Sequence, residues 1–294
     1  MKKLIQYALL FSIITLLLFS SESSNITINV ITVFVLKILP MLAPVMILNN
    51  LFIYSGGSFS LLSKCNFNIK VKHRIAILID VFLGILSGTP VLANMVNEDQ
   101  NQTIDKEESQ EILNNFTAPS LPFLIALAKI SNWPLHIRYF VIFIPLSIEI
   151  LIFSHFIFKH DCSLFKVNNE NQGNENIVAK SILTTCKTLV LMLGSIILFS
   201  LFLIPLNVLK GEIKLFIQGI IEFSYPLSLL FSKDYINNYF YVITIISFAS
   251  LSLILQVKLI TPKIKAKKII KRRLLITALS NIILFILISF LKPH

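Results

Sequence analysis

The sequence predicts an all-α integral membrane protein with about eight to nine membrane segments, some of them broken or re-entrant. Hydrophobic residues make up 55% of the chain and charged residues 14%, and the mean hydropathy is +0.80. Soluble domains average about 45–50% apolar and about 25% charged residues. Several apolar runs approach or exceed the ~20 residues that a helix needs to cross the hydrocarbon core. Gly, Pro, Ser, Thr and Asn interrupt several runs, and a bilayer tolerates such breaks only where the freed backbone faces protein or a water-filled cavity.

The net charge of +11 indicates membrane topology rather than a nucleic-acid-binding surface. Lys and Arg concentrate in short loops between apolar runs, as they do in cytoplasmic loops. These loops cover residues 57–74, 131–138, 206–214 and 258–273. The alternating loops are neutral or acidic, which predicts a multi-pass cell-membrane protein with a cytoplasmic N-terminus.

We predict five regions along the chain. Residues 1–26 form a signal-anchor-like helix, with a cleaved signal peptide as the alternative. Residues 27–158 and 181–257 form two similar halves, for which an inverted relation is one arrangement. An extramembrane loop, residues 159–180, connects them. Residues 258–294 contain the strongest basic loop and a last helix.

The densest interruptions lie between residues 83 and 130. A half-helix that begins inside the membrane leaves its first N–H groups unpaired and exposes the positive end of its dipole. We predict that two such ends, near Pro90 and Pro122, face each other over a carboxylate. The alternative is a pair of kinked helices in which Ser and Thr satisfy the freed backbone. The predicted substrate-binding residues are Ser87, Gly88, Thr89, Pro90, Asn94, Asn115, Thr117 and Ser120.

Charged residues within apolar segments need a partner or mark a function. The predicted coupling or buried charges are Glu222, Lys37, Asp80 and Glu149. Glu222 precedes a break and is a candidate to hold a coupling proton or cation, with a structural pair to a lysine as the alternative. We expect Glu149 to pair with Lys187 and Lys37 with Asp80; an unpaired Lys37 would instead attract an anion.

The second half carries a weaker counterpart of these breaks. Its small polar residues favour close helix packing, and they predict a cavity shared by the two halves. The predicted second-half cavity residues are Ser224, Ser247, Ser250 and Gln256.

Six short motifs follow one another along the chain between Leu39 and Val257. The motifs are Leu39-Pro-Met-Leu-Ala-Pro, Gly84-Ile-Leu-Ser-Gly-Thr-Pro-Val, Asp105-Lys-Glu-Glu-Ser-Gln-Glu, Asn114-Asn-Phe-Thr-Ala-Pro, Gly219-Ile-Ile-Glu and the helix Ser247–Gln256. The series resembles the sporulation integral membrane proteins that contain the nucleoside-recognition (Gate) domain. The resemblance implies a transporter-like protein of endospore-forming bacteria, whose best-understood members are linked to moving dipicolinic acid across the outer forespore membrane. Thr89 stands where that family usually has Tyr, and Phe248-Ala249 replaces Gly-Gly, which bears on substrate identity.

We therefore predict a permease for a small anionic metabolite, with dipicolinate as the substrate that the resemblance implies. A non-transporting membrane component or scaffold needed for spore formation is the alternative. The three cysteines are scattered, no H-E-x-x-H motif occurs and the histidines are not grouped near a nucleophile. We accordingly expect no enzyme activity, no catalytic residues, no cofactor and no metal site. The expected partners are the small-molecule anion and the lipid bilayer, with homo-oligomerisation left open and nucleic acid excluded.

Overall fold

The computed structural model confirms the all-α prediction, because all regular secondary structure in the described residues is helical. The structure describes residues 20–55, 58, 61–62, 65, 68–99, 106–129, 131, 133–159, 176–204, 206, 209–232 and 236–291. Most of the predicted signal-anchor helix and of the connecting loop lies outside these residues.

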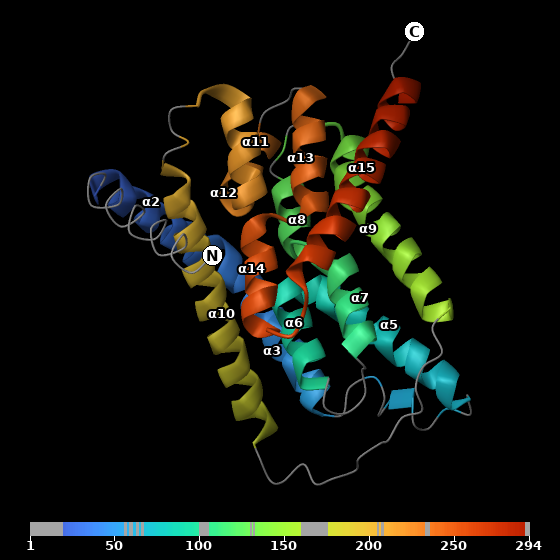
Figure 1. Cartoon of the computed structure of the whole chain (residues 1–294). Helices are drawn as coiled ribbons and strands as arrows, with labels where there is room; N and C mark the ends of the chain where they lie inside the picture. Colours follow the sequence, from blue (N-terminus) through green and yellow to red (C-terminus); the bar gives the residue numbers. More distant parts are fainter. Residues whose placement is uncertain are drawn as a thin grey trace.

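The helices follow one another along the chain in the order shown in Figure 1. The first group is α2 (Ser20–Val33), the π-helical η1 (Phe34–Ile38), α3 (Leu39–Tyr54), α5 (Ile69–Ser87), α6 (Thr89–Asp99), α7 (Lys106–Phe116), α8 (Leu121–Lys129) and α9 (Leu135–Lys159). The second group is α10 (Ile177–Phe202), α11 (Gly211–Ile221), α12 (Ser224–Phe231), α13 (Ile236–Phe248), α14 (Leu251–Ile260) and α15 (Ala266–Leu291).

Four helical stretches of the described chain are long and apolar enough to cross a membrane. They are Leu135–Ile157, Ile177–Phe202, Asn238–Ile260 and Ala266–Phe290. The third stretch combines α13 and α14 across their break. The other apolar segments are divided into shorter helices, so length and composition support a helical membrane protein and leave the expected eight to nine segments as a prediction.

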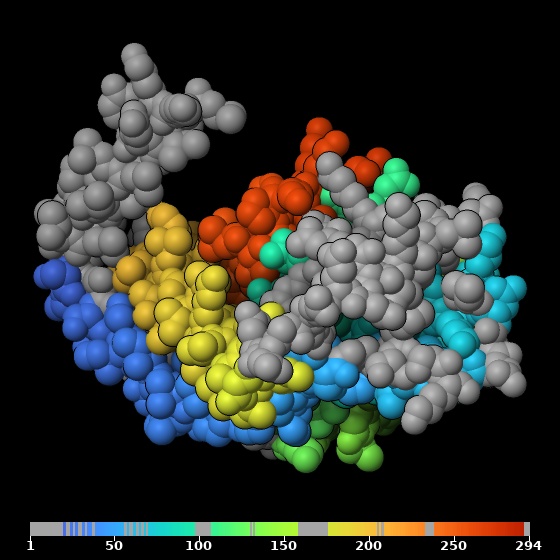
Figure 2. Space-filling model, turned by 90° about the horizontal axis from the view of Figure 1, so that it is seen from below, coloured from blue at the N-terminus to red at the C-terminus, as the bar shows by residue number. Residues whose placement is uncertain are grey.

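The stretch Asn238–Ile260 forms the centre of the bundle. In its most apolar part 72% of the residues are buried, whereas 22% are buried in the most apolar part of α15. Helix α13 packs against α15, α9, α11 and α12, while α14 packs against α6, α10 and α15. Seen from below in Figure 2, α10 (yellow) lies between the N-terminal helices (blue) and the C-terminal segment (orange-red). Outward-facing apolar side chains on α10 and α15, such as Leu183, Val190 and Phe290, are exposed, as expected of helices that face lipid.

All four predicted basic loops prove to be partly helical. Helices α5, α9, α11 and α15 begin inside the expected loops 57–74, 131–138, 206–214 and 258–273, at Ile69, Leu135, Gly211 and Ala266. Lys and Arg are good helix formers, so a topology signal does not require irregular backbone. The last helix therefore includes Arg273, which the sequence placed in the loop before it.

Gly88 makes the break between α5 and α6. Its φ of 93° and ψ of 163° lie in a region that is essentially restricted to glycine. A Cβ on Gly88 would also lie 3.1 Å from the Cβ of Ser120. Pro90 occupies the first turn of α6, where its missing N–H has no intrahelical partner to lose. The local chemistry thus fixes the break where the sequence predicted it.

The break between α13 and α14 has a different origin. Ala249 and Ser250 adopt φ values of 73° and 49°, which are unusual for residues with a Cβ. The Ser250 hydroxyl accepts a hydrogen bond from the Leu253 N–H at 3.5 Å and begins α14. Both residues are buried, so the surrounding packing holds this backbone conformation.

The variant Gly88→Ala is expected to lose about 1–3 kcal/mol of unfolding free energy, because alanine resists this backbone conformation. Gly194→Ala is the matched control, since Gly194 lies within α10 and a Cβ there would meet no atom within 4 Å. Thermal or denaturant unfolding of the purified protein in detergent measures both. Equal stability of the two variants would contradict the role assigned to Gly88.

Candidate functional site

Thr89 joins the two interruptions of the first half directly. Its hydroxyl donates to the Ala118 carbonyl oxygen at 2.6 Å and accepts from the Ala118 N–H at 2.8 Å. Ala118 lies in the non-helical segment between α7 and α8. The sequence predicted that the two helix ends face each other, and the structure brings the breaks into contact through one side chain.

The other predicted substrate-binding residues divide into four groups. Ser87 and Thr117 donate their hydroxyl protons to carbonyls one turn earlier in their own helices, those of Leu83 and Leu113. Gly88 and Pro90 are buried backbone elements of the break.

Asn94 contacts α10 instead of the breaks: its amide donates to Thr188 Oγ1 at 2.5 Å. Asn115 and Ser120 remain as incompletely bonded groups beside the breaks. The Asn115 amide donates to the Glu111 carbonyl oxygen at 2.9 Å. Asn115 Oδ1 and Ser120 Oγ are buried and have no hydrogen-bond partner among the described residues.

A buried ion pair lies next to these breaks. The Arg273 guanidinium of α15 donates through Nη1 to the Glu149 carboxylate of α9 and through Nη2 to the Thr117 carbonyl oxygen. Arg273 is 0% exposed and Glu149 is 2% exposed. One side chain therefore connects α15, α9 and the end of α7.

The expected pair between Glu149 and Lys187 is wrong. Helix α9 packs against α15, whereas Lys187 lies on an exposed side of α10. The true partner, Arg273, was assigned to a cytoplasmic basic loop. Its helical spacing from the buried residues Ile269 and Ile276 was the signal that pointed inward.

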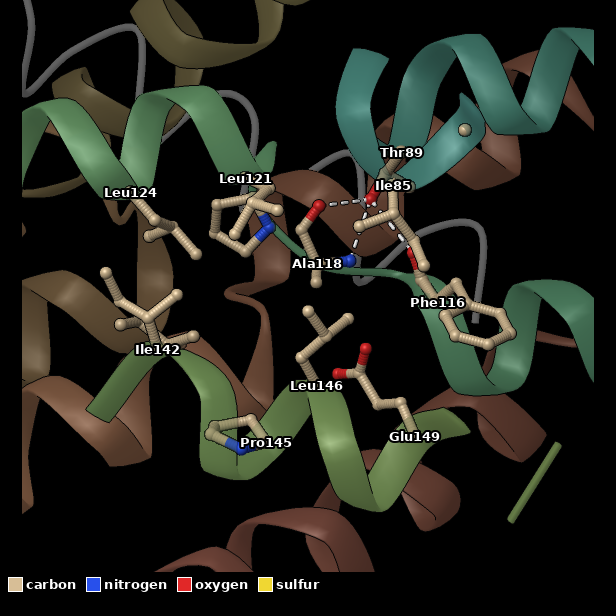
Figure 3. Close-up of a pocket in the computed structure, with 13 residues that line it drawn as sticks. Ile85, Thr89, Phe116, Ala118, Leu121, Leu124, Ile142, Pro145, Leu146 and Glu149 are labelled. Carbon is tan, nitrogen blue, oxygen red and sulfur yellow. Dashed lines mark hydrogen bonds between the residues drawn. The ribbon is translucent and has the colours of Figure 1, made fainter. Parts of the chain in front are cut away.

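A small cavity opens between the two breaks and α9. Thr89, Ala118, Pro145 and Glu149 contribute to its lining, and Ile246 is the contribution of α13. Figure 3 shows the Glu149 carboxylate and the Leu146 side chain directed toward the space below Ala118. The cavity volume of about 20 Å³ is enough for about one water molecule. In this conformation the cavity is therefore too small for a larger molecule.

The remaining predicted charges have partners of a different kind. Both carboxylate oxygens of Glu222 accept a hydrogen bond from the Ser224 N–H, at 3.0 and 3.1 Å. An anion at this position stabilises the start of α12, so Glu222 pairs with backbone rather than with a lysine. Asp80 accepts a hydrogen bond from the Ser58 hydroxyl. The Lys37 side chain lies outside the described part of the structure.

The predicted second-half residues do not line this cavity. Ser247 donates to the Ile243 carbonyl oxygen at 2.5 Å, and the hydroxyls of Ser250 and Ser252 lie 3.0 Å apart. Gln256 donates to Ser195 Oγ of α10 at 2.6 Å. Ser224 Oγ is buried with no hydrogen-bond partner among the described residues.

Helix α10 carries a row of hydroxyl groups that the sequence analysis missed. In addition to the contacts of Thr188 and Ser195, Thr185 accepts from the Asn50 amide at 2.9 Å. The Thr184 hydroxyl lies 3.0 Å from that of Tyr54. We call Thr184, Thr185, Thr188 and Ser195 the α10 hydroxyl row. Its signal was the recurrence of Ser and Thr at helical spacing in an otherwise apolar segment.

Polar residues in the first two turns of α7 are also buried, namely Glu108, Ser109 and Gln110. Glu108 lies 3.2 Å from His73 Nε2 of α5, and Glu111 accepts from Arg272 Nη2 at 2.9 Å. The Gln110 side-chain oxygen accepts from the Lys265 N–H at 2.8 Å. These contacts hold α7 between α5 and α15.

Arg273→Leu is expected to lower the unfolding free energy by about 3–5 kcal/mol, because it leaves Glu149 buried without its cation. The double variant Arg273→Leu/Glu149→Leu should recover much of that loss. Arg272→Leu is the neighbouring control; its pair is partly exposed, so the loss should be within about 1 kcal/mol. A double-mutant cycle from unfolding in detergent measures the coupling, and additive losses at the two sites would contradict it.

Comparison with known proteins does not extend this description of the site. No family model, no curated protein and no solved structure matches the chain. The resemblance to the sporulation membrane proteins therefore stays a prediction from sequence motifs.

Proposed function

We propose that this chain is a membrane permease that moves a small anionic metabolite through a cavity between broken helices. The observation that carries the proposal is the contact of two helix breaks beside a cavity whose wall includes the carboxylate of a buried ion pair. Ionisable side chains inside a membrane protein are costly and are typical of transport pathways.

The order of elements supports a two-halved architecture. When α15, from the separate C-terminal region 258–294, is grouped with the second half, both groups have a helical segment, two interrupted pairs and a long helix: α3, α5/α6, α7/α8, α9, and then α10, α11/α12, α13/α14, α15. The first pair of each half is folded so that its helices pack on each other. In Figure 1, α5/α6 lies in the lower part of the molecule and α11/α12 in the upper part. We propose that the halves are inverted repeats, an architecture common among secondary transporters.

The closed cavity defines what transport would require. A space for one water molecule must enlarge before an organic anion enters, and the Thr89–Ala118 contact lies at its wall. Alternating access would separate the two breaks first toward one side of the membrane and then toward the other. The sequence contains no ATP-binding motif, so a gradient, downhill flow or a partner would supply the energy.

The substrate and the cellular location come from the resemblance. We propose membership of the sporulation family with the nucleoside-recognition domain, dipicolinate as the anion and the cell membrane, including the outer forespore membrane, as the location. The predicted cytoplasmic N-terminus belongs to the same proposal.

Uptake of dipicolinate into proteoliposomes that contain the full chain tests the function. Wild-type protein should take up dipicolinate, and Leu146→Trp should reduce the initial rate at least about tenfold, because the larger side chain would fill the cavity. Leu151→Trp is the matched control on the same helix. Leu151 is 68% exposed on the outer face, so its replacement should leave uptake unchanged.

Absence of uptake by the wild-type protein would overturn the proposal and favour a non-transporting role. Equal rates for the two tryptophan variants would place the pathway elsewhere. Thermal unfolding of both variants separates a blocked cavity from a failure to fold.

A further inference from the structure

We infer that Arg273 is the anion-binding residue of this permease and that Glu149 competes with the anion for it. Binding of an anionic substrate therefore transfers one proton from solution to Glu149. The inference rests on the proposed transport function and adds to it the binding residue and the coupling ion.

The geometry of Arg273 supports an anion-binding role. Its Nη1 and Nη2 groups contact Glu149 and the Thr117 carbonyl oxygen, while Nε is buried with no hydrogen-bond partner among the described residues. A guanidinium group presents a planar set of donors that matches a carboxylate in two hydrogen bonds. Release of Glu149 would free Nη1 to donate to an anion, and Nε, on the other side of the guanidinium, would remain a separate donor.

The position of Glu149 makes the two interactions exclusive. Glu149 lines the cavity, whereas Arg273 contacts Glu149 and does not itself line the cavity. An anion in the cavity therefore reaches the guanidinium only when the Glu149 carboxylate withdraws. Two carboxylates beside one buried cation would carry an uncompensated negative charge, which is costly inside a protein. Protonation of Glu149 removes that charge.

Other titratable groups lie on the helices packed against α9 and α15. They are Glu107, Glu108 and Glu111 on α7, Lys129 on α8, Tyr239 and Tyr241 on α13, Lys258 on α14, His136, Arg138, Tyr139 and His155 on α9, and Lys267, Lys268, Lys271 and Arg272 on α15.

Two of the acids on α7 have side-chain partners other than Arg273. Glu108 contacts His73, and Glu111 contacts Arg272. Glu149 is the carboxylate that contacts Arg273. The proton that balances the incoming anion is accordingly assigned to Glu149.

The charge balance of the step is simple. One proton moves from solution to the Glu149 carboxylate, the Arg273–Glu149 ion pair separates, and an ion pair between Arg273 and the substrate carboxylate replaces it. No covalent bond other than the O–H bond on Glu149 is formed. By linkage, the anion binds more tightly as the pH falls, and the proton binds more tightly when the anion is present.

Isothermal titration of the full chain in detergent with dipicolinate tests the inference. The Kd of the wild-type protein should decrease up to about tenfold for each unit of decreasing pH while Glu149 is ionised. Titration in two buffers of different ionisation enthalpy should show uptake of about one proton per anion. Glu149→Gln, a neutral side chain of the same shape, should bind dipicolinate with a Kd independent of pH and without proton uptake.

Two further variants separate the coupling from general damage. Glu222→Gln removes the other candidate coupling carboxylate, which contacts backbone instead of Arg273; loss of the wild-type pH dependence in this variant would assign the proton to Glu222 and contradict the role of Glu149. Arg273→Gln/Glu149→Gln removes both charges of the pair and leaves no uncompensated charge. This variant should fold, as thermal unfolding would show, and its affinity for dipicolinate should be at least about tenfold weaker than that of Glu149→Gln alone.

The outcomes distinguish this inference from the proposed function. If the wild-type protein neither binds nor transports dipicolinate, the proposed function with this substrate fails. If the wild-type protein transports dipicolinate but Glu149→Gln keeps the pH dependence and the proton uptake, the coupling role of Glu149 is wrong and the permease stands. If the variant without both charges binds as tightly as Glu149→Gln, Arg273 is not the anion-binding residue.

Discussion

The interior of this protein depends on the interactions of one buried group, the guanidinium of Arg273. A buried arginine without a partner is costly, so the helices that surround it must present acceptors in fixed positions. Glu149 on α9 and the carbonyl of Thr117 at the end of α7 do so. The Thr117 carbonyl is available because α7 ends there, where the last carbonyls of a helix have no intrahelical partner. The break and the ion pair are therefore parts of one arrangement.

The same arrangement brings separate parts of the chain to one place. Thr89 contacts Ala118, one residue after the carbonyl that Arg273 contacts. These contacts thus bring four parts of the chain together: the start of α6, the segment between α7 and α8, helix α9 and helix α15. A further contact, the edge-on packing of Phe123 against Phe223 at 5.6 Å between ring centroids, connects α8 to the break between α11 and α12. The interrupted helices are hence held by polar side-chain contacts as well as by packing in the hydrophobic core.

The parts of this structure that depend on local chemistry were predictable from the sequence. Hydropathy indicates a helical membrane protein, and the residues around Gly88 and Pro90 predict a break because their backbone preferences are intrinsic. The partner of Glu149 was not predictable in this way. Arg273 lies 124 positions away in sequence, and its pairing depends on which helices pack together. The adjacent Arg272 carries the same charge, yet it lies on a partly exposed side of α15, so only the helical register separates a surface arginine from a buried one.

The α10 hydroxyl row has a mechanical consequence. Hydroxyl groups donate as well as accept, and interhelical hydrogen bonds of this kind contribute on average only about 0.6 kcal/mol each in a measured membrane protein. Helices α3, α6 and α14 contact this row through Asn50, Asn94 and Gln256. A side-chain amide displaced by one helical turn from Thr188 would meet Thr184 or Thr185 instead of an apolar surface. A shift of α6 by one turn along α10 would therefore exchange one weak hydrogen bond of Asn94 for another, because hydroxyl groups lie at both positions.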